Sequence, residues 1–121
     1  MRTDDIPVFD PVPAREIQHR IQTLKTGLAA AGLDSVLLMH KPDLYYFSGT
    51  AQDAYLYVAT DRAPLLLVRR YLPRARAESG IPDIVPITSV SDIPGRILDF
   101  HGRLPETMGI AFDVVPVRDY R

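Results

Sequence analysis

The sequence predicts an α/β domain with three layers around a mixed sheet of about five strands. Two observations carry this prediction. A stretch with helical periodicity leads directly into a short apolar strand, which is how an α/β unit begins. Two further apolar strands, 54–59 and 65–68, are joined by a turn so short that they must be antiparallel neighbours. The sheet is therefore expected to be mixed rather than purely parallel.

The first helix is predicted from an apolar stripe that recurs every three or four residues after Pro13. Its members are Ile17, Ile21, Leu24, Leu28 and Ala31, and Gly32 is expected to end it. Residues 35–39 follow as a continuous apolar run, which is typical of a strand buried on both faces. Residues 1–12 show no periodicity and several prolines, so we expect an extended arm there.

The later elements are predicted from turn residues and local periodicity. Residues 54–59 alternate tyrosine with aliphatic side chains, which places Tyr55 and Tyr57 on one face of a strand. Three further helical segments are predicted: a turn over 42–48 ended by Gly49, a helix over 73–79 closed by Gly80, and a helix capped by Ser91 that runs to about Phe100. Two further strands are predicted over 84–86 and 108–112. A last helix is predicted to start at Pro116. Because only five residues follow Pro116, we expect a chain cut from a longer protein.

Length and composition limit the function classes. The chain has 121 residues, which suits one domain, and it has no cysteine, which excludes disulfides and thiolate metal sites. A net charge of −1 gives no reason to expect a nucleic-acid or anionic-membrane partner. The acidic, proline-containing N-terminus is unlike a signal peptide, and the apolar runs are too short to span a bilayer. We therefore expect a cytoplasmic protein.

The sequence offers few catalytic patterns. The three histidines lack the spacing of a metal site, and the glycines form neither a dinucleotide-binding fingerprint nor a phosphate-binding loop. His40 is the best candidate among the histidines, because it follows a buried strand and α/β proteins bind ligands at the carboxyl ends of strands. A loop histidine without a ligand is the alternative interpretation.

Tyrosines and arginines cluster in the middle of the chain. Five of the six tyrosines lie between positions 45 and 71, and they form either a core layer or a contact surface. The arginines at 69, 70, 74 and 76 form either a solvated face, paired with acids such as Glu78, or a surface that meets a carboxylate on another subunit or on a substrate. Both alternatives stay open at this point.

Residues 42–49, Pro-Asp-Leu-Tyr-Tyr-Phe-Ser-Gly, resemble a segment of the creatinase/prolidase N-terminal domain family. The helix that leads through Gly32-Leu33-Asp34 into the first strand is similar to that family, as are residues 65–70 and 74–79. The resemblance covers about residues 14–121. One departure is Asp43, where the family commonly has asparagine.

This resemblance implies a ribonuclease-H-like fold over residues 13–121 and a non-catalytic role. Family members join this domain to a C-terminal metallopeptidase domain, absent here, in which two Asp, one His and two Glu bind two divalent metal ions (Mn, Co or Zn). The parent would be a hydrolase of the Xaa-Pro dipeptidase (prolidase) or aminopeptidase P type. The N-terminal domain would build a homo-oligomer, such as a dimer, and cover the catalytic cleft. The residues expected near that cleft, beside the loop 49–53, are His40, Tyr46, Asp53, Tyr55 and Arg70.

Two alternatives share the same scaffold. The chain could be an interaction module without catalysis, as in some histone chaperones, or the accessory domain of a creatinase-type amidinohydrolase, because fold does not fix function. A nucleotide-binding domain is less favoured, because the sequence lacks a glycine-rich loop.

Overall fold

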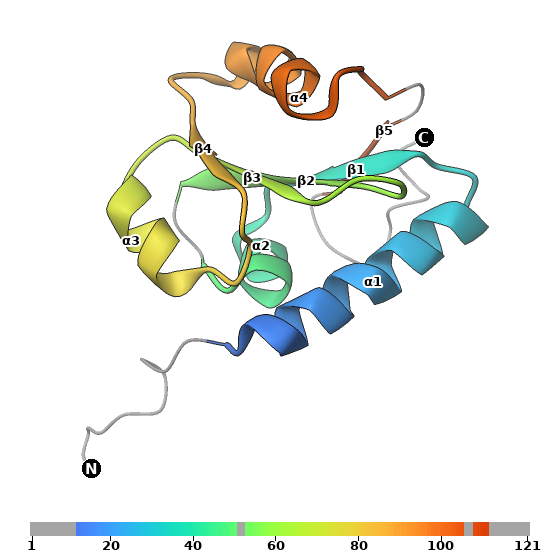
Figure 1. Cartoon of the computed structure of the whole chain (residues 1–121), viewed down its shortest axis with the longest axis horizontal. Coiled ribbons are helices and arrows are strands. Elements are labelled where there is room, and N and C mark those ends of the chain that lie inside the picture. The colour runs from blue at the N-terminus through green and yellow to red at the C-terminus, as the bar shows by residue number, and fades with distance from the viewer. Residues whose placement is uncertain (1–11, 51–52, 106–107, 112–121) are drawn as a thin grey trace.

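A computed structural model describes residues 12–50, 53–105 and 108–111 of the chain. Figure 1 shows a central sheet with α4 on one side and α1, α2 and α3 on the other, which confirms the three-layer α/β architecture. The elements in chain order are α1 (Ala14–Ala30), β1 (Ser35–Leu38), α2 (Lys41–Ser48), β2 (Ala54–Ala59), β3 (Leu65–Val68), α3 (Leu72–Glu78), β4 (Ile84–Pro86), the 3-10 turn η2 (Val90–Asp92), α4 (Ile93–His101) and β5 (Met108–Ala111). Within the described ranges, no helix combines the length and the apolar character that a membrane span needs.

The described strands form one five-stranded sheet in the order β4-β3-β2-β1-β5. β2 lies between β1 and β3 and runs antiparallel to both. The outer strands are parallel to their neighbours, β4 to β3 and β5 to β1. The prediction of a mixed sheet of about five strands, with an antiparallel pair at 54–68, is therefore confirmed.

Each face of the sheet carries its own hydrophobic core. The alternation in β2 sends Leu56 and Val58 to one core and Tyr57 to the other. The first core lies under α1, α2 and α3, with Ile17 of α1 fully buried. The second core lies under α4, which contributes Ile93 and Ile97.

Two predicted helix ends are confirmed by backbone geometry. Gly32 follows α1 with a φ of +76°, and the N–H of Leu33 donates to the carbonyl of Leu28 at 3.0 Å. This is the Schellman arrangement, in which a glycine takes the left-handed conformation. Gly49 ends α2 in the same conformation, with a φ of +86°.

Two predicted boundaries are wrong. α3 ends at Glu78 with Ser79 in an extended conformation, so Gly80 does not close the helix. Gly80 instead makes room for α1, since a Cβ there would stand 2.9 Å from Cγ1 of Ile17. Ser91 does not cap α4, because the N-cap of α4 is Asp92, which also forms a capping box with Ser89 around the preceding turn η2. The expected arm over residues 1–11, the strand end at Phe112 and the helix at Pro116 lie outside the described residues.

Candidate functional site

The termini of three strands meet at one end of the sheet. β2 is antiparallel to both neighbours, with Leu38 of β1 opposite Leu56 and Val68 of β3 opposite Ala54. The ends of β1 and β3 therefore lie beside the start of β2. Three of the five candidate residues lie just outside these termini, namely His40, Asp53 and Arg70, and Tyr55 is the second residue of β2.

A depression of about 210 Å³ opens at this end of the sheet. Buried and half-buried apolar side chains make up much of its wall, and Lys41 and Asp53 bring charges. The lining residues are Met39, Lys41, Leu44, Asp53, Ala54 and Tyr55. Such a depression can hold an apolar group next to a charged one.

Asp53 connects the depression to the arginines at the end of β3. Its backbone carbonyl accepts a hydrogen bond from the N–H of Arg69 at 2.8 Å, which holds the two strand ends together. Its carboxylate oxygen Oδ2 lies 3.9 Å from Nε of Arg69 and 3.8 Å from Nε of Arg70. Two guanidinium groups thus approach one carboxylate oxygen, and Arg70 is 65% exposed. Asp53 and Arg70, both expected near a cleft, are brought together here, and Tyr55 lines the same depression as Asp53.

His40 stands next to the depression without lining it. Its backbone caps the start of α2, where its carbonyl accepts a hydrogen bond from the N–H of Leu44 at 2.9 Å. The side chain is exposed, and its chain neighbours Met39 and Lys41 both line the depression.

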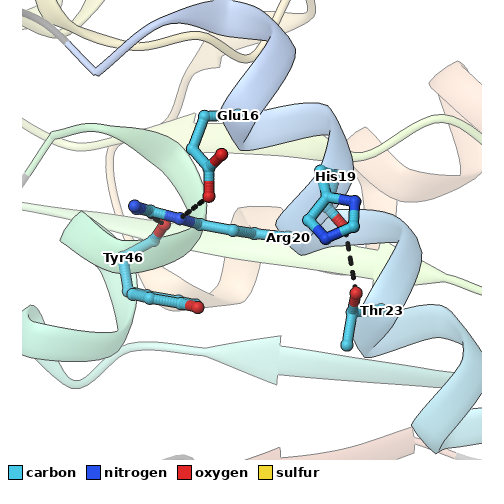
Figure 2. A network of polar contacts seen from close by, with 5 residues as sticks. All are labelled: Glu16, His19, Arg20, Thr23 and Tyr46. Atoms are coloured by element: carbon cyan, nitrogen blue, oxygen red, sulfur yellow. Dashed lines mark hydrogen bonds and ion pairs between the residues drawn. The ribbon is translucent and has the colours of Figure 1, made fainter.

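Tyr46 lies apart from the other candidates, against α1 rather than in the depression. Figure 2 shows Arg20 of α1 between Glu16 and Tyr46. The guanidinium of Arg20 donates to Glu16 at 3.1 Å and to the backbone carbonyl of Tyr46 at 2.8 Å. Its central carbon lies 4.2 Å from the centre of the Tyr46 ring, a cation–π contact. Tyr46 therefore braces α2 against α1. Sequence reasoning missed Arg20, since nothing local relates it to a residue 26 positions later.

A network of hydrogen bonds fixes the end of α2 and the residues directly after it, up to Thr50. The carbonyl of Ser48 accepts the N–H of Gly80 at 2.9 Å. The hydroxyl of Thr50, which is buried, donates to Glu78 at 2.8 Å, and Arg74 donates to the same carboxylate at 3.0 Å. The pairing of an arginine with Glu78 was one of the two alternatives for the arginine cluster, whereas the link to Thr50 was not predicted. The start of the loop that leads to Asp53 is therefore held by α3.

The tyrosines divide between the two predicted roles. Tyr57 is fully buried in the core under α4, and burial raises the pKa of its hydroxyl, which a hydrogen bond with Ser35 partly offsets. Tyr55 is half-buried, while Tyr45, Tyr46 and Tyr71 are exposed. Neither interpretation thus holds for the whole cluster.

Comparisons with known proteins agree with this architecture. A model of the creatinase/prolidase N-terminal domain matches residues 20–121. The chain belongs to the creatinase/prolidase N-terminal domain family. No curated protein sequence matched the chain.

Solved structures share the fold at low sequence identity. The domain superposes on an Xaa-Pro dipeptidase from Bacillus anthracis with a TM-score of 0.68 and 14% identity, over 86% of this chain and 30% of that one. For an aminopeptidase P from Streptococcus thermophilus the TM-score is 0.66 with 21% identity, over 85% and 80% of the two chains. For the N-terminal domain of the cytoplasmic peptidase PepQ from Mycobacterium tuberculosis H37Rv it is 0.67 with 24% identity, over 84% and 81%. The chain thus spans less than a third of the B. anthracis dipeptidase.

The described residues of this creatinase/prolidase N-terminal domain do not form a metal site. Among them, no group of three or more His, Asp or Glu side chains lies close enough to hold an ion. His40 and His101 illustrate this separation. His40 begins α2, whereas His101 ends α4, where its Nε2 lies 3.0 Å from the carbonyl oxygen of Ala63.

A second depression, of about 270 Å³, lies at the opposite end of the sheet beside the β2–β3 turn. Its charged side chains include two aspartates and two arginines, so they balance one another. Arg103 and Asp61 form an ion pair across it. Because these charges balance and two of them already form an ion pair, this depression favours neither an anionic nor a cationic ligand.

Proposed function

We propose that this domain is the non-catalytic N-terminal part of a metal-dependent Xaa-Pro peptidase, of the dipeptidase or aminopeptidase P type. The observation that carries the proposal is the family match over residues 20–121. The fold shared with an Xaa-Pro dipeptidase and with an aminopeptidase P supports it. In this role the domain serves oligomerisation, for example as a dimer, and covers the catalytic cleft.

The divalent metal ions of such a peptidase, Mn, Co or Zn, belong to a C-terminal catalytic domain in this proposal. The described residues of this chain do not provide a ligand set for them. The chain's own contribution is the placement of side chains near the substrate, and we assign that role to the sheet end with His40, Asp53, Tyr55 and Arg70. Tyr46 contributes indirectly, because its contact with Arg20 holds α2, and hence the start of the loop, in place.

The test is hydrolysis by the complete gene product. We expect it to cleave Ala-Pro or Ala-Pro-Ala when Mn²⁺ is supplied, while residues 1–121 alone are inactive. In the complete protein, Asp53→Asn and Arg70→Gln are expected to raise KM about threefold to tenfold, as loss of uniform binding does. Arg96→Gln, on the exposed side of α4, is the matched control and is expected to leave KM unchanged.

Two results would contradict the proposal. A complete protein without Xaa-Pro hydrolysis under any of the three metals would argue against the peptidase role. Unchanged kinetics and an unchanged oligomeric state in the Asp53 and Arg70 variants, measured by analytical ultracentrifugation, would argue against the role of this sheet end.

A further inference from the structure

The depression at the end of β1 and β2 is surrounded by an excess of positive charge. Lys41 lines it together with Asp53, and Arg69 and Arg70 both approach the Asp53 carboxylate. Two arginines therefore approach one carboxylate, and Lys41 adds a third cation to the described residues at this depression. This excess attracts a ligand with negative charge.

The arginines here are held less tightly than Arg20 and Arg74, which are paired with Glu16 and Glu78. Nε lies 3.8 Å from Asp53 in Arg70 and 3.9 Å in Arg69. In the pairs Arg20–Glu16 and Arg74–Glu78 the distances are 3.1 and 3.0 Å. Charged hydrogen bonds are strongest at about 2.7–2.9 Å, so the arginines at Asp53 retain donor capacity for a second carboxylate.

The size of the depression favours one side chain over a whole small molecule. Its volume is about 210 Å³. Pockets that enclose cofactors and drug-sized ligands measure about 300–1,000 Å³. The apolar walls from Met39, Leu44, Ala54 and Tyr55 suit an aliphatic side chain that enters beside the charged rim.

Tyr71, the residue after Arg70, has a strained backbone and an exposed ring. Its φ is +64°, and it is the only residue other than glycine with a positive φ in the described part of the chain. The left-handed conformation costs a non-glycine residue about 1–2 kcal/mol. The side chain is 64% exposed, so core packing does not account for a tyrosine at this position. Strain of this kind concentrates at functional sites, and tyrosine and arginine are enriched at interface hot spots.

We propose that Met39, Lys41, Asp53, Tyr55, Arg70 and Tyr71 form a docking surface for a protein segment that presents an aliphatic side chain next to a carboxylate. The aliphatic group enters the depression, the carboxylate meets the guanidinium of Arg70, and Tyr71 packs on the segment. This inference rests on the proposed function, because the same sheet end is assigned to the cleft, and it adds the chemistry of the segment that meets it.

The experiment is an NMR titration of the ¹⁵N-labelled chain of 121 residues. The probe is the pentapeptide acetyl-Gly-Glu-Leu-Glu-Gly-amide. One control peptide replaces both Glu by Lys, and a second replaces Leu by Gly. With the acidic, leucine-containing peptide we expect saturable chemical-shift changes at the amides of residues 39–41, 53–55 and 69–71. With either control peptide we expect a dissociation constant at least about fivefold higher.

Variants separate binding from folding. Arg70→Glu and Tyr71→Gly are each expected to weaken the probe about fivefold to tenfold. Tyr71→Gly removes the strain and is expected to keep or raise the melting temperature, so its loss of binding would not reflect unfolding. Arg96→Glu on α4 is expected to bind like the wild type.

Several results would overturn the docking surface. These are the absence of saturable shifts at the three segments, equal binding of the Lys peptide, or unchanged affinity in Arg70→Glu. Free N-acetyl-leucine that binds as tightly as the pentapeptide would indicate a small-molecule site instead. The titration and the hydrolysis assay test the two proposals independently. A failed titration leaves the expected hydrolysis by the complete protein in place, and an inactive complete protein leaves the expected titration in place.

Discussion

The two faces of the sheet are covered in different ways. Three helices, α1, α2 and α3, cover one face, and a single helix, α4, covers the other (Figure 1). On the three-helix face the packing is so close that a Cβ at Gly80 would contact Ile17 and a Cβ at Gly49 would contact the backbone of Glu78. Both cores are bordered by partly buried apolar side chains, and on the α4 face these are Met39, Tyr55 and Val85.

This difference separates stability from recognition. The three-helix face holds the larger core and the network that fixes Thr50 after α2. The α4 face leaves Met39 and Tyr55 available, and both line the depression at the end of the sheet. The α4 face therefore supplies Met39 and Tyr55 to the wall of the candidate site, whereas Leu44 and Ala54 of that wall belong to the three-helix core, which holds the site in position.

The largest expected effect compares one isoleucine from each face. Ile17→Ala is expected to lower the free energy of unfolding by about 3–4 kcal/mol, because Ile17 is completely buried between α1 and the sheet and the cavity cannot close. Ile97→Ala, under α4, is expected to cost about 2–3 kcal/mol, because a single covering helix can settle toward the sheet. Urea denaturation measures both values. A larger loss for Ile97→Ala would reverse the comparison.

Two glycines test the closeness of packing with matched backbone geometry. Gly49 and Gly102 have φ values of +86° and +82°. A Cβ at Gly49 would stand 3.1 Å from the carbonyl oxygen of Glu78, whereas a Cβ at Gly102 meets nothing within 4 Å. Gly102→Ala is therefore expected to cost about 1 kcal/mol from backbone strain alone, and Gly49→Ala about 2 kcal/mol. Equal losses in thermal or urea denaturation would mean that the junction at Gly49 is not tight.

The brace between α1 and α2 is expected to have a smaller effect. Arg20→Met keeps much of the aliphatic stem but loses the hydrogen bond to the Tyr46 carbonyl and the contact with the Tyr46 ring. We expect a loss of about 1 kcal/mol, since one partner is a charged donor at a partly exposed site. Arg15→Met, on the exposed side of the same helix, serves as the control. A control that loses as much as Arg20→Met would show that helix propensity, rather than the brace, is responsible.

The smallest effect concerns the start of α4. Hydrogen bonds from the N–H and the hydroxyl of Thr88, and then from the N–H of Ser89, lower the pKa of Asp92. A carboxylate with a lowered pKa stabilises the fold above its unfolded pKa of about 4, and this contribution is lost as the pH falls through the folded value. The melting temperature is therefore expected to fall on acidification below about pH 4, with a shallower fall in Asp92→Asn. Identical pH profiles of the two proteins would contradict this.

Much of the fold could be predicted from the sequence because periodicity and turn residues are local signals. The alternation in 54–59 assigned Tyr55 and Tyr57 to one face, and the short turn before 65–68 required an antiparallel pair. Gly80 was misjudged for a physical reason. A glycine that ends a helix and a glycine that allows another helix to approach look the same in a sequence.

The candidate site was predicted less completely. Asp53, Tyr55 and Arg70 were expected near a cleft from the family resemblance and from their places beside the loop 49–53, and the sheet brings Asp53 next to Arg70 and to the depression that Tyr55 lines. The contact of Arg20 with Tyr46 depends on how α1 crosses α2, which no local pattern encodes. The left-handed backbone of Tyr71 was missed because tyrosine gives no turn signal.

The most direct measurement for the central claim is the reading frame of the source gene beyond the codon for Arg121. The account predicts that the frame continues into a domain with two Asp, one His and two Glu as metal ligands, and that this complete protein cleaves Xaa-Pro bonds. A stop codon at that position, or a following domain that lacks those ligands, would contradict the account.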